Sequence, residues 1–223
     1  MTLRGLAVVT GCTFVAMWMA GCNGSAPSEV ETPIAAQAPQ AADTPKPVEA
    51  PKPPAPPVAA VAPVAKLAIR VDCGAVEPYL DKQGNQWAAD RELADGVPWG
   101  ADNGMTMDRE GVGITGTEMP RIYETERYSM GSYKFTVPNG LYTVRLHFAE
   151  TYEGITAAGE RVFSVSLGGQ VVLKDLDPFK EVGALKPVVK EYKGVAVQDG
   201  QLLIGFTPNI ENPQICGIEV IGE

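Results

Sequence analysis

Alternation of large apolar side chains with mostly polar ones over residues 142–149 constrains the fold of this chain more than any other feature. Between Tyr142 and Phe148 every second residue is apolar, and the residues between them are mostly polar. A period of two is typical of a β-strand with one buried face. His147 falls on the polar face, so the pattern predicts that it is a surface residue.

Comparable strand patterns recur along the rest of the chain, and no segment has a long helical period. They occupy residues 67–72, 132–137, 161–167, 170–173, 188–197, 202–206 and 215–221. Asn139-Gly140, Gly168-Gly169 and Asp199-Gly200 separate successive strands, and such dipeptides favour tight hairpin turns. Many short strands joined by tight turns predict an all-β, antiparallel β-sandwich.

The chain between the first strand and Gly131 has weak strand signals. Residues 73–120 are rich in Gly, Asp and Asn, which predicts long ordered loops at one end of the sandwich. Trp87 and Trp99 lie in this region, and we expect them to pack the loops against the sandwich. The alternative is that either tryptophan is an exposed platform for a ligand.

Charge and residue counts exclude several classes of function. The 223 residues contain 18 Lys and Arg against 27 Asp and Glu, a net charge of −9, which argues against a nucleic-acid partner. A single His excludes a multi-histidine metal site, and no glycine-rich phosphate loop is present. Asp102 and Asp108 lack the spacing of a calcium-binding loop, so we expect no metal and no cofactor.

Residues 1–22 resemble a bacterial secretion signal, with Arg4 before an apolar stretch. Met19-Ala20-Gly21-Cys22 is similar to a lipobox, although Met replaces the usual Leu. This resemblance implies a diacylglycerol on the Cys22 thiol and cleavage before Cys22. The alternative is an ordinary signal peptide that happens to end near a cysteine.

Residues 23–65 predict a tether. They contain 11 Pro and 12 Ala and no aromatic residue, so they cannot bury enough apolar area to fold. Proline-rich chains favour extended polyproline II, which suits a semi-rigid stalk between a membrane and a domain. The alternative is a docking ligand for a partner. With Cys22, the tether predicts an extracytoplasmic, lipid-anchored protein that faces the periplasm or lies on the cell surface.

Seven short motifs within the predicted domain, residues 66–223, resemble the malectin family in their order and spacing. This family comprises carbohydrate-binding β-sandwiches. The motifs are Val71-Asp72-Cys73-Gly74, Ala101-Asp102-Asn103-Gly104-Met105, Ile122-Tyr123-Glu124-Thr125-Glu126-Arg127-Tyr128, Leu146-His147-Phe148-Ala149-Glu150-Thr151-Tyr152, Arg161-Val162-Phe163-Ser164-Val165, Lys174-Asp175-Leu176-Asp177-Pro178-Phe179 and Glu211-Asn212-Pro213-Gln214-Ile215.

The resemblance implies a jelly-roll or galactose-binding-like sandwich that binds glucose-containing oligosaccharides without cleaving them. Tyr128 and Tyr152 match sugar-contacting tyrosines of the animal members. Glu211 stands where those proteins have a sugar-binding aspartate. Asn103 and Glu153 stand where they have a tyrosine and a phenylalanine, so specificity for glucosylated glycans is not carried over.

The residue types fit sugar binding on chemical grounds. An aromatic ring stacks on the C–H face of a sugar, and carboxylates or amides accept and donate hydrogen bonds to its hydroxyl groups. We therefore expect the five side chains to converge on one cleft at one end of the sandwich. Two alternatives are that Tyr128 and Tyr152 belong to the edge of the core, and that the loops bind a protein or surface partner.

Two further expectations concern acids and cysteines. Glycosidases need two suitably spaced carboxylates. The family resemblance implies a structural role for Glu124 and Glu126, with Arg127 as the expected ion partner, and we predict no enzyme. Cys73 and Cys216 lie in the first and last strands, which we expect to run antiparallel as neighbours. The sequence leaves open whether the two form a disulfide or remain thiols.

Overall fold

The computed structural model describes residues 67–223, almost the whole predicted domain. The predicted signal with Cys22 and the predicted tether at residues 23–65 lie outside the described residues. None of the helices within 67–223 is long and apolar enough to cross a membrane.

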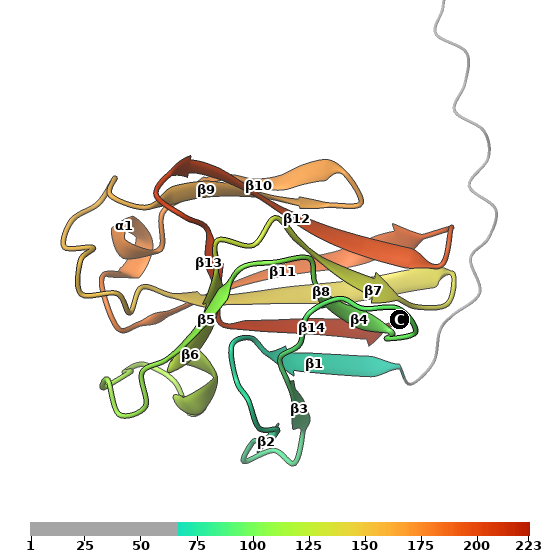
Figure 1. Cartoon of the computed structure of the whole chain (residues 1–223), viewed down its shortest axis with the longest axis horizontal. Coiled ribbons are helices and arrows are strands. Elements are labelled where there is room, and N and C mark those ends of the chain that lie inside the picture. The colour runs from blue at the N-terminus through green and yellow to red at the C-terminus, as the bar shows by residue number, and fades with distance from the viewer. Residues whose placement is uncertain (1–66) are drawn as a thin grey trace, which may run out of the picture. The chain divides into compact units, whose positions relative to one another are not determined.

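Two large sheets and one small sheet make up the domain (Figure 1). The first large sheet contains, in spatial order, β11 (Pro187–Val197), β8 (Gly140–Ala149), β14 (Gly217–Gly222), β1 (Ala68–Asp72), β3 (Gln86–Ala89) and β2 (Tyr79–Leu80). The second contains β10 (Gln170–Leu176), β9 (Val162–Leu167), β12 (Gln201–Ile210), β7 (Ser132–Thr136) and β4 (Trp99–Ala101). The small sheet contains β13 (Gln214–Ile215), β6 (Thr125–Tyr128) and β5 (Met105–Asp108).

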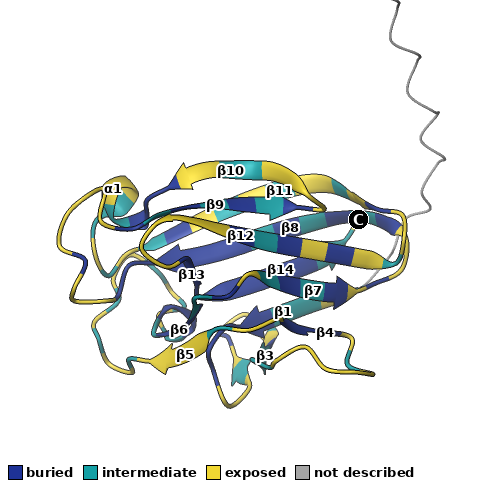
Figure 2. Ribbon diagram, turned by 45° about the horizontal axis from the view of Figure 1, so that its top comes forward, coloured by how far each residue is buried: buried dark blue, intermediate teal, exposed yellow. Residues whose placement is uncertain are grey.

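The main hydrophobic core is built from both large sheets. On β8, the alternating apolar side chains from Tyr142 to Phe148 are fully buried in this core. Burial also alternates along β12, as Figure 2 shows. Apart from the parallel pair β1 and β3, the paired strands run antiparallel, so the predicted antiparallel sandwich is confirmed.

Only one of the three predicted hairpins forms. Gly168-Gly169 joins β9 to its neighbour β10, as expected. The prediction for Asn139-Gly140 and Asp199-Gly200 was wrong, because each turn carries the chain from one large sheet to the other. The two turns meet instead: Gly200 N donates to Asn139 Oδ1 at 2.8 Å.

The first and last strands pair antiparallel, as the sequence predicted, and Cys73 N donates to the Cys216 carbonyl at 2.8 Å. Both cysteines are nevertheless free and buried, which corrects the disulfide alternative. The side chain of Cys73 packs in the main core, whereas that of Cys216 packs in a separate cluster with Trp87 and Tyr123. The two thiols belong to different packing environments although their backbones touch.

That second cluster explains why the prediction of an exposed His147 was wrong. His147 is only 3% exposed, because Trp87 and Tyr123 cover its ring on the outer face of the first large sheet. Its Nδ1 lies 2.8 Å from the Tyr123 hydroxyl and its Nε2 3.1 Å from a Glu219 carboxylate oxygen. Burial favours a raised pKa for Glu219, but the bond to His147 and nearby arginines hold it below its ordinary value.

Both tryptophans pack inside the domain, as we expected from the sequence. Trp87 is 1% exposed, and its indole N–H donates to Asp81 at 3.1 Å. Trp99 is 4% exposed and stacks on Phe135, with the Arg91 guanidinium 3.9 Å above its ring. Neither is an exposed platform.

A close approach at Gly74 positions β6, the strand that carries Tyr128. Gly74 has φ +89°, and a Cβ there would lie 2.3 Å from the Glu126 carbonyl oxygen. Asp90 reinforces this approach, because it accepts from Gly74 N at 2.8 Å and from Arg127 Nε at 2.7 Å. The expected pairing of Arg127 with Glu124 or Glu126 is therefore wrong, since Arg127 is the partner of Asp90.

A buried carboxyl in β1 predicts a pH-dependent stability. Asp72 is 1% exposed and its Oδ2 has no hydrogen-bond partner; burial raises its pKa from 3.8 to about 7. This group therefore stabilises the fold below pH 4, and the contribution is lost as pH rises through about 7. Between pH 4 and pH 8 the wild-type protein should lose about 2–4 kcal/mol of unfolding free energy through this group, and Asp72→Asn should remove that loss. Denaturant titrations at a series of pH values measure both. Asp95→Asn, at an exposed position, is the control; a wild-type-to-D72N difference that stays constant with pH would contradict the assignment.

Candidate functional site

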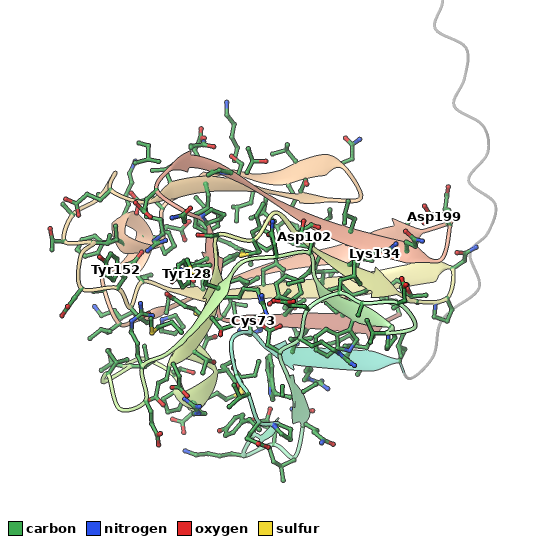
Figure 3. All side chains as sticks on the ribbon, in the orientation of Figure 1. Cys73, Asp102, Tyr128, Lys134, Tyr152 and Asp199 are labelled. Carbon is green, nitrogen blue, oxygen red and sulfur yellow. The ribbon has the colours of Figure 1, made fainter. Side chains whose placement is uncertain are left out.

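A cavity of about 240 Å³ lies between β5, β6 and the loops that follow β8 and β12. We call it the inner cavity. The labelled Tyr128 and Tyr152 lie at the same end of the domain (Figure 3). The inner cavity is lined by Met107, Arg109, Glu126, Tyr128, Tyr152, Arg161 and Glu211.

A second cavity of about 480 Å³ adjoins the inner one, and we call it the outer cavity. The two share Met107, Arg109 and Tyr152, so Tyr152 borders both. The full lining is Met107, Arg109, Glu110, Gly111, Val112, Thr151, Tyr152 and Glu153.

The structure brings together four of the five residues predicted from the sequence. Tyr128, Tyr152 and Glu211 line the inner cavity, and Glu153 lines the outer one. Asn103 lines neither cavity. Its Oδ1 accepts from Gly131 N at 2.9 Å and its carbonyl accepts from an arginine, so it supports the loop before β5.

Tyr152 is 47% exposed and therefore does not belong to the core. Its ring packs against Gly154, where an added Cβ would lie 2.5 Å from Tyr152 Cε1. The Arg109 guanidinium lies 6.0 Å from the centre of the ring on one face. The ring is thus held by its neighbours while a large part of it faces solvent.

Tyr128 is half-buried at the end of β6, opposite Met105 of β5. Its hydroxyl lies 3.7 Å from the Met105 sulfur. A tyrosine in this position offers an apolar ring and a polar tip to the same cavity.

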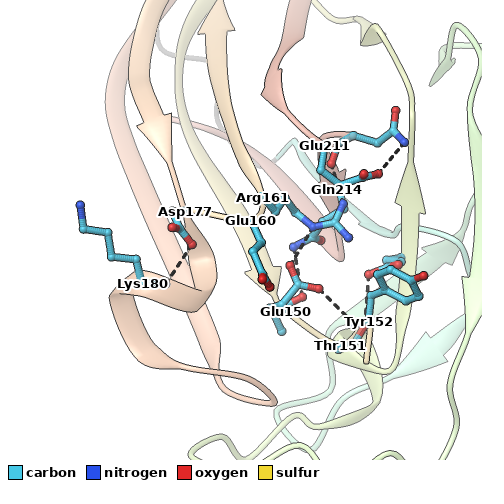
Figure 4. A network of polar contacts seen from close by, with 12 residues as sticks. Glu150, Thr151, Tyr152, Glu160, Arg161, Asp177, Lys180, Glu211 and Gln214 are labelled. Atoms are coloured by element: carbon cyan, nitrogen blue, oxygen red, sulfur yellow. Dashed lines mark hydrogen bonds and ion pairs between the residues drawn. The ribbon is translucent and has the colours of Figure 1, made fainter. Parts of the chain in front are cut away.

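A buried ion pair fixes the loops around the inner cavity (Figure 4). Arg161 Nε donates to Glu150 at 2.7 Å, with side-chain exposures of 4% and 0%. Glu150 also accepts from Tyr152 N at 3.0 Å, and Arg161 Nη1 donates to the Asn212 carbonyl at 2.5 Å. Burial raises the pKa of Glu150 although Arg161 opposes the shift. One ion pair therefore ties the Tyr152 loop to the loop that carries Glu211.

A second ion pair forms the wall between the cavities. Arg109 Nη1 donates to Glu126 at 2.8 Å and to Thr151 Oγ1 at 3.2 Å, and Thr151 donates to the other Glu126 oxygen. The Glu126 side chain is only 3% exposed. Both arginines of the inner cavity are thus neutralised by buried carboxylates.

Glu211 differs from these acids, because it is exposed and makes no ion pair within residues 67–223. It has φ +57°, a left-handed conformation that is uncommon for a residue with a side chain. Asn212 Nδ2 donates to its carboxylate at 2.8 Å. Its charge therefore remains available to a ligand in the cavity.

Sequence reasoning did not single out Met107, Arg109, Glu126 or Arg161 as lining residues. A signal existed for Glu126, which lies two positions before Tyr128 on one strand and so shares its face. Nothing local indicated the arginines, because their positions depend on contacts with Glu126 and Glu150.

The described residues contain no group of three or more His, Cys, Asp or Glu side chains arranged to hold a metal ion. Asp102 accepts hydrogen bonds from Gly131 and Ser132, and Asp108 pairs with Arg121 at 2.8 Å. These loop acids therefore make structural contacts.

Together, the fold and the cavities define a β-sandwich with a polar, tyrosine-bearing site built by loops.

A family model described as Malectin domain matches residues 67–219, and the chain belongs to this family. Malectin from Homo sapiens is 33% identical over 116 residues, a match covering 45% of this chain and 39% of that protein. Malectin from Mus musculus is 32% identical with the same coverage. The chain thus spans about two fifths of the length of these curated relatives.

Solved structures share the fold. A Bacteroides uniformis beta-glucuronidase superposes with a TM-score of 0.64 at 24% identity, over 70% of this chain and 18% of that chain. The plant receptor-like kinase FER superposes with a TM-score of 0.59 at 22% identity, over 69% of this chain and 48% of that chain. At these identities the likeness concerns the fold alone.

The contact with Gly154 gives a test of how Tyr152 is held. We expect Gly154→Ala to displace the ring, because the new Cβ would overlap it, while unfolding free energy changes by less than about 1 kcal/mol. Ring signals of Tyr152 in NMR spectra and denaturant titration measure the two effects. In a Tyr152→Ala background, Gly154→Ala should have almost no further effect on stability. Unchanged ring signals in the single variant would contradict this packing.

Proposed function

We propose that the domain binds carbohydrate in the inner cavity without cleaving it. The observation that carries the proposal is the convergence of Tyr128, Tyr152 and Glu211 on one cavity. The tyrosines present ring surface for the C–H face of a sugar. Glu211 and the Arg109 guanidinium present polar groups to its hydroxyls, in charge-assisted hydrogen bonds.

The alternative function, binding of a protein or surface partner, has less support. A protein-binding face is expected to be a broad apolar patch. Here the apolar Met107 shares the inner cavity with two arginines and two glutamates, a mixture that suits hydroxyl groups better. Membership of the malectin-domain family supports the carbohydrate proposal further.

We also propose that the domain is held outside the cytoplasm by a lipid on Cys22 and a tether over residues 23–65. The lipobox-like run and the proline-rich composition support this arrangement. The cavity would then face the periplasm or the exterior, where glycans occur.

A glycan array probed with the purified full chain tests the proposed function. We expect retention of a limited set of oligosaccharides, and Tyr152→Ala to weaken binding of those ligands by about 1–3 kcal/mol through the lost stacking area. The melting temperature should change little, since Tyr152 is 47% exposed. Leu203→Ala, at an exposed position 44% accessible on β12, is the control and should bind as wild type does. Failure to retain any glycan would refute the proposal.

Detergent phase separation tests the anchor. We expect the wild-type chain to enter the detergent-rich phase, and Cys22→Ala to remain in the aqueous phase or to stay unprocessed, because the thiol that carries the lipid is absent. Cys12→Ala changes the other cysteine of residues 1–22, which lies outside the lipobox-like run, so it is the matched control and should behave as wild type. A wild-type chain found in the aqueous phase would show that the lipoprotein interpretation is wrong.

A further inference from the structure

The outer cavity continues the inner one along the surface. Tyr152, Arg109 and Met107 belong to both linings, so a chain that leaves the inner cavity passes the exposed Tyr152 ring. The inner volume of about 240 Å³ lies below the ~300–1,000 Å³ typical of ligand sites, whereas the outer cavity adds about 480 Å³. The two cavities together suit a ligand longer than one sugar unit.

The acidic and basic side chains that line the two cavities do not balance each other. Each positive group is neutralised, Arg109 by Glu126 at 2.8 Å and Arg161 by Glu150 at 2.7 Å. Glu110 and Glu153 line the outer cavity, are exposed, and form no ion pair among residues 67–223. With Glu211 in the inner cavity, the uncompensated charge of the site is therefore entirely negative.

We propose that the outer cavity is a subsite for the next sugar units of a chain, and that Glu110 and Glu153 set its preference by charge. Sugars with free amino groups bind tightest, neutral sugars follow, and uronic acids bind weakest. The physical reason is the attraction of a carboxylate for an ammonium group and its repulsion of another carboxylate. This inference rests on the proposed function.

The experiment uses the full chain and an array of monosaccharides and tetrasaccharides of glucosamine, glucose and glucuronic acid, each tetrasaccharide in α-1,3, α-1,4, β-1,3 and β-1,4 linkage. We expect tetrasaccharides to bind at least about tenfold tighter than the corresponding monosaccharide. At low salt, affinity should fall about fivefold from glucosamine to glucose tetrasaccharides and about fivefold again from glucose to glucuronic acid tetrasaccharides. Both differences should become smaller at high salt.

A matched pair of double variants isolates the two carboxylates. Glu110→Gln with Glu153→Gln should flatten the ranking of the tetrasaccharides. Glu77→Gln with Asp95→Asn removes the same net charge at exposed positions outside both cavities, and should preserve the ranking. An equal effect of both double variants would show that only the general field of the protein acts, and would overturn the proposal.

Failure of this inference can be told from failure of the proposed function. Equal affinity for monosaccharides and tetrasaccharides, or tightest binding of uronic acids, overturns the outer subsite while carbohydrate binding stands. Absence of binding to every glycan on a wider array overturns both.

Discussion

The buried ion pair between Glu150 and Arg161 is the interaction on which the site depends. It joins the end of β8 to the start of β9. Through hydrogen bonds to the backbone it also holds the Tyr152 loop and the loop that carries Glu211. Removing one partner of such a pair leaves an uncompensated buried charge, which typically costs about 3–5 kcal/mol. The arrangement of Tyr152 and Glu211 around the inner cavity therefore depends on this buried electrostatic contact.

The small sheet depends on similar polar contacts with the sandwich. Asp90 receives hydrogen bonds from Gly74, Arg127 and Tyr133, and so joins β6 to β7 and to the end of β1. Thr125 at the start of β6 donates to the buried Asp72 of β1. The strand that carries Tyr128 is thus fixed by hydrogen bonds from several sides, and a rigid support of this kind suits a preorganised site.

Sequence reasoning succeeded where a pattern reports burial of one face. The period of two over β8 predicted its buried apolar side chains from Tyr142 to Phe148, and the dipeptide Gly168-Gly169 predicted a hairpin. It failed at Asn139-Gly140 because a turn signal does not specify the sheet in which the next strand lies. It failed at His147 because Trp87 and Tyr123, which come from other segments of the chain, cover the polar face of β8 at this position.

By itself, the sequence determined the class of fold, the family, and the candidate role of Tyr128, Tyr152, Glu153 and Glu211, because alternation and short motifs are local properties of the chain. Only the tertiary structure decided that Asn103 supports a loop, that Cys73 and Cys216 are free thiols, and that Arg109 and Arg161 line the inner cavity. The physical reason is that these features depend on which distant segments pack together. A side chain's partner in a sandwich lies across a sheet or on another loop, at a separation that no local pattern encodes.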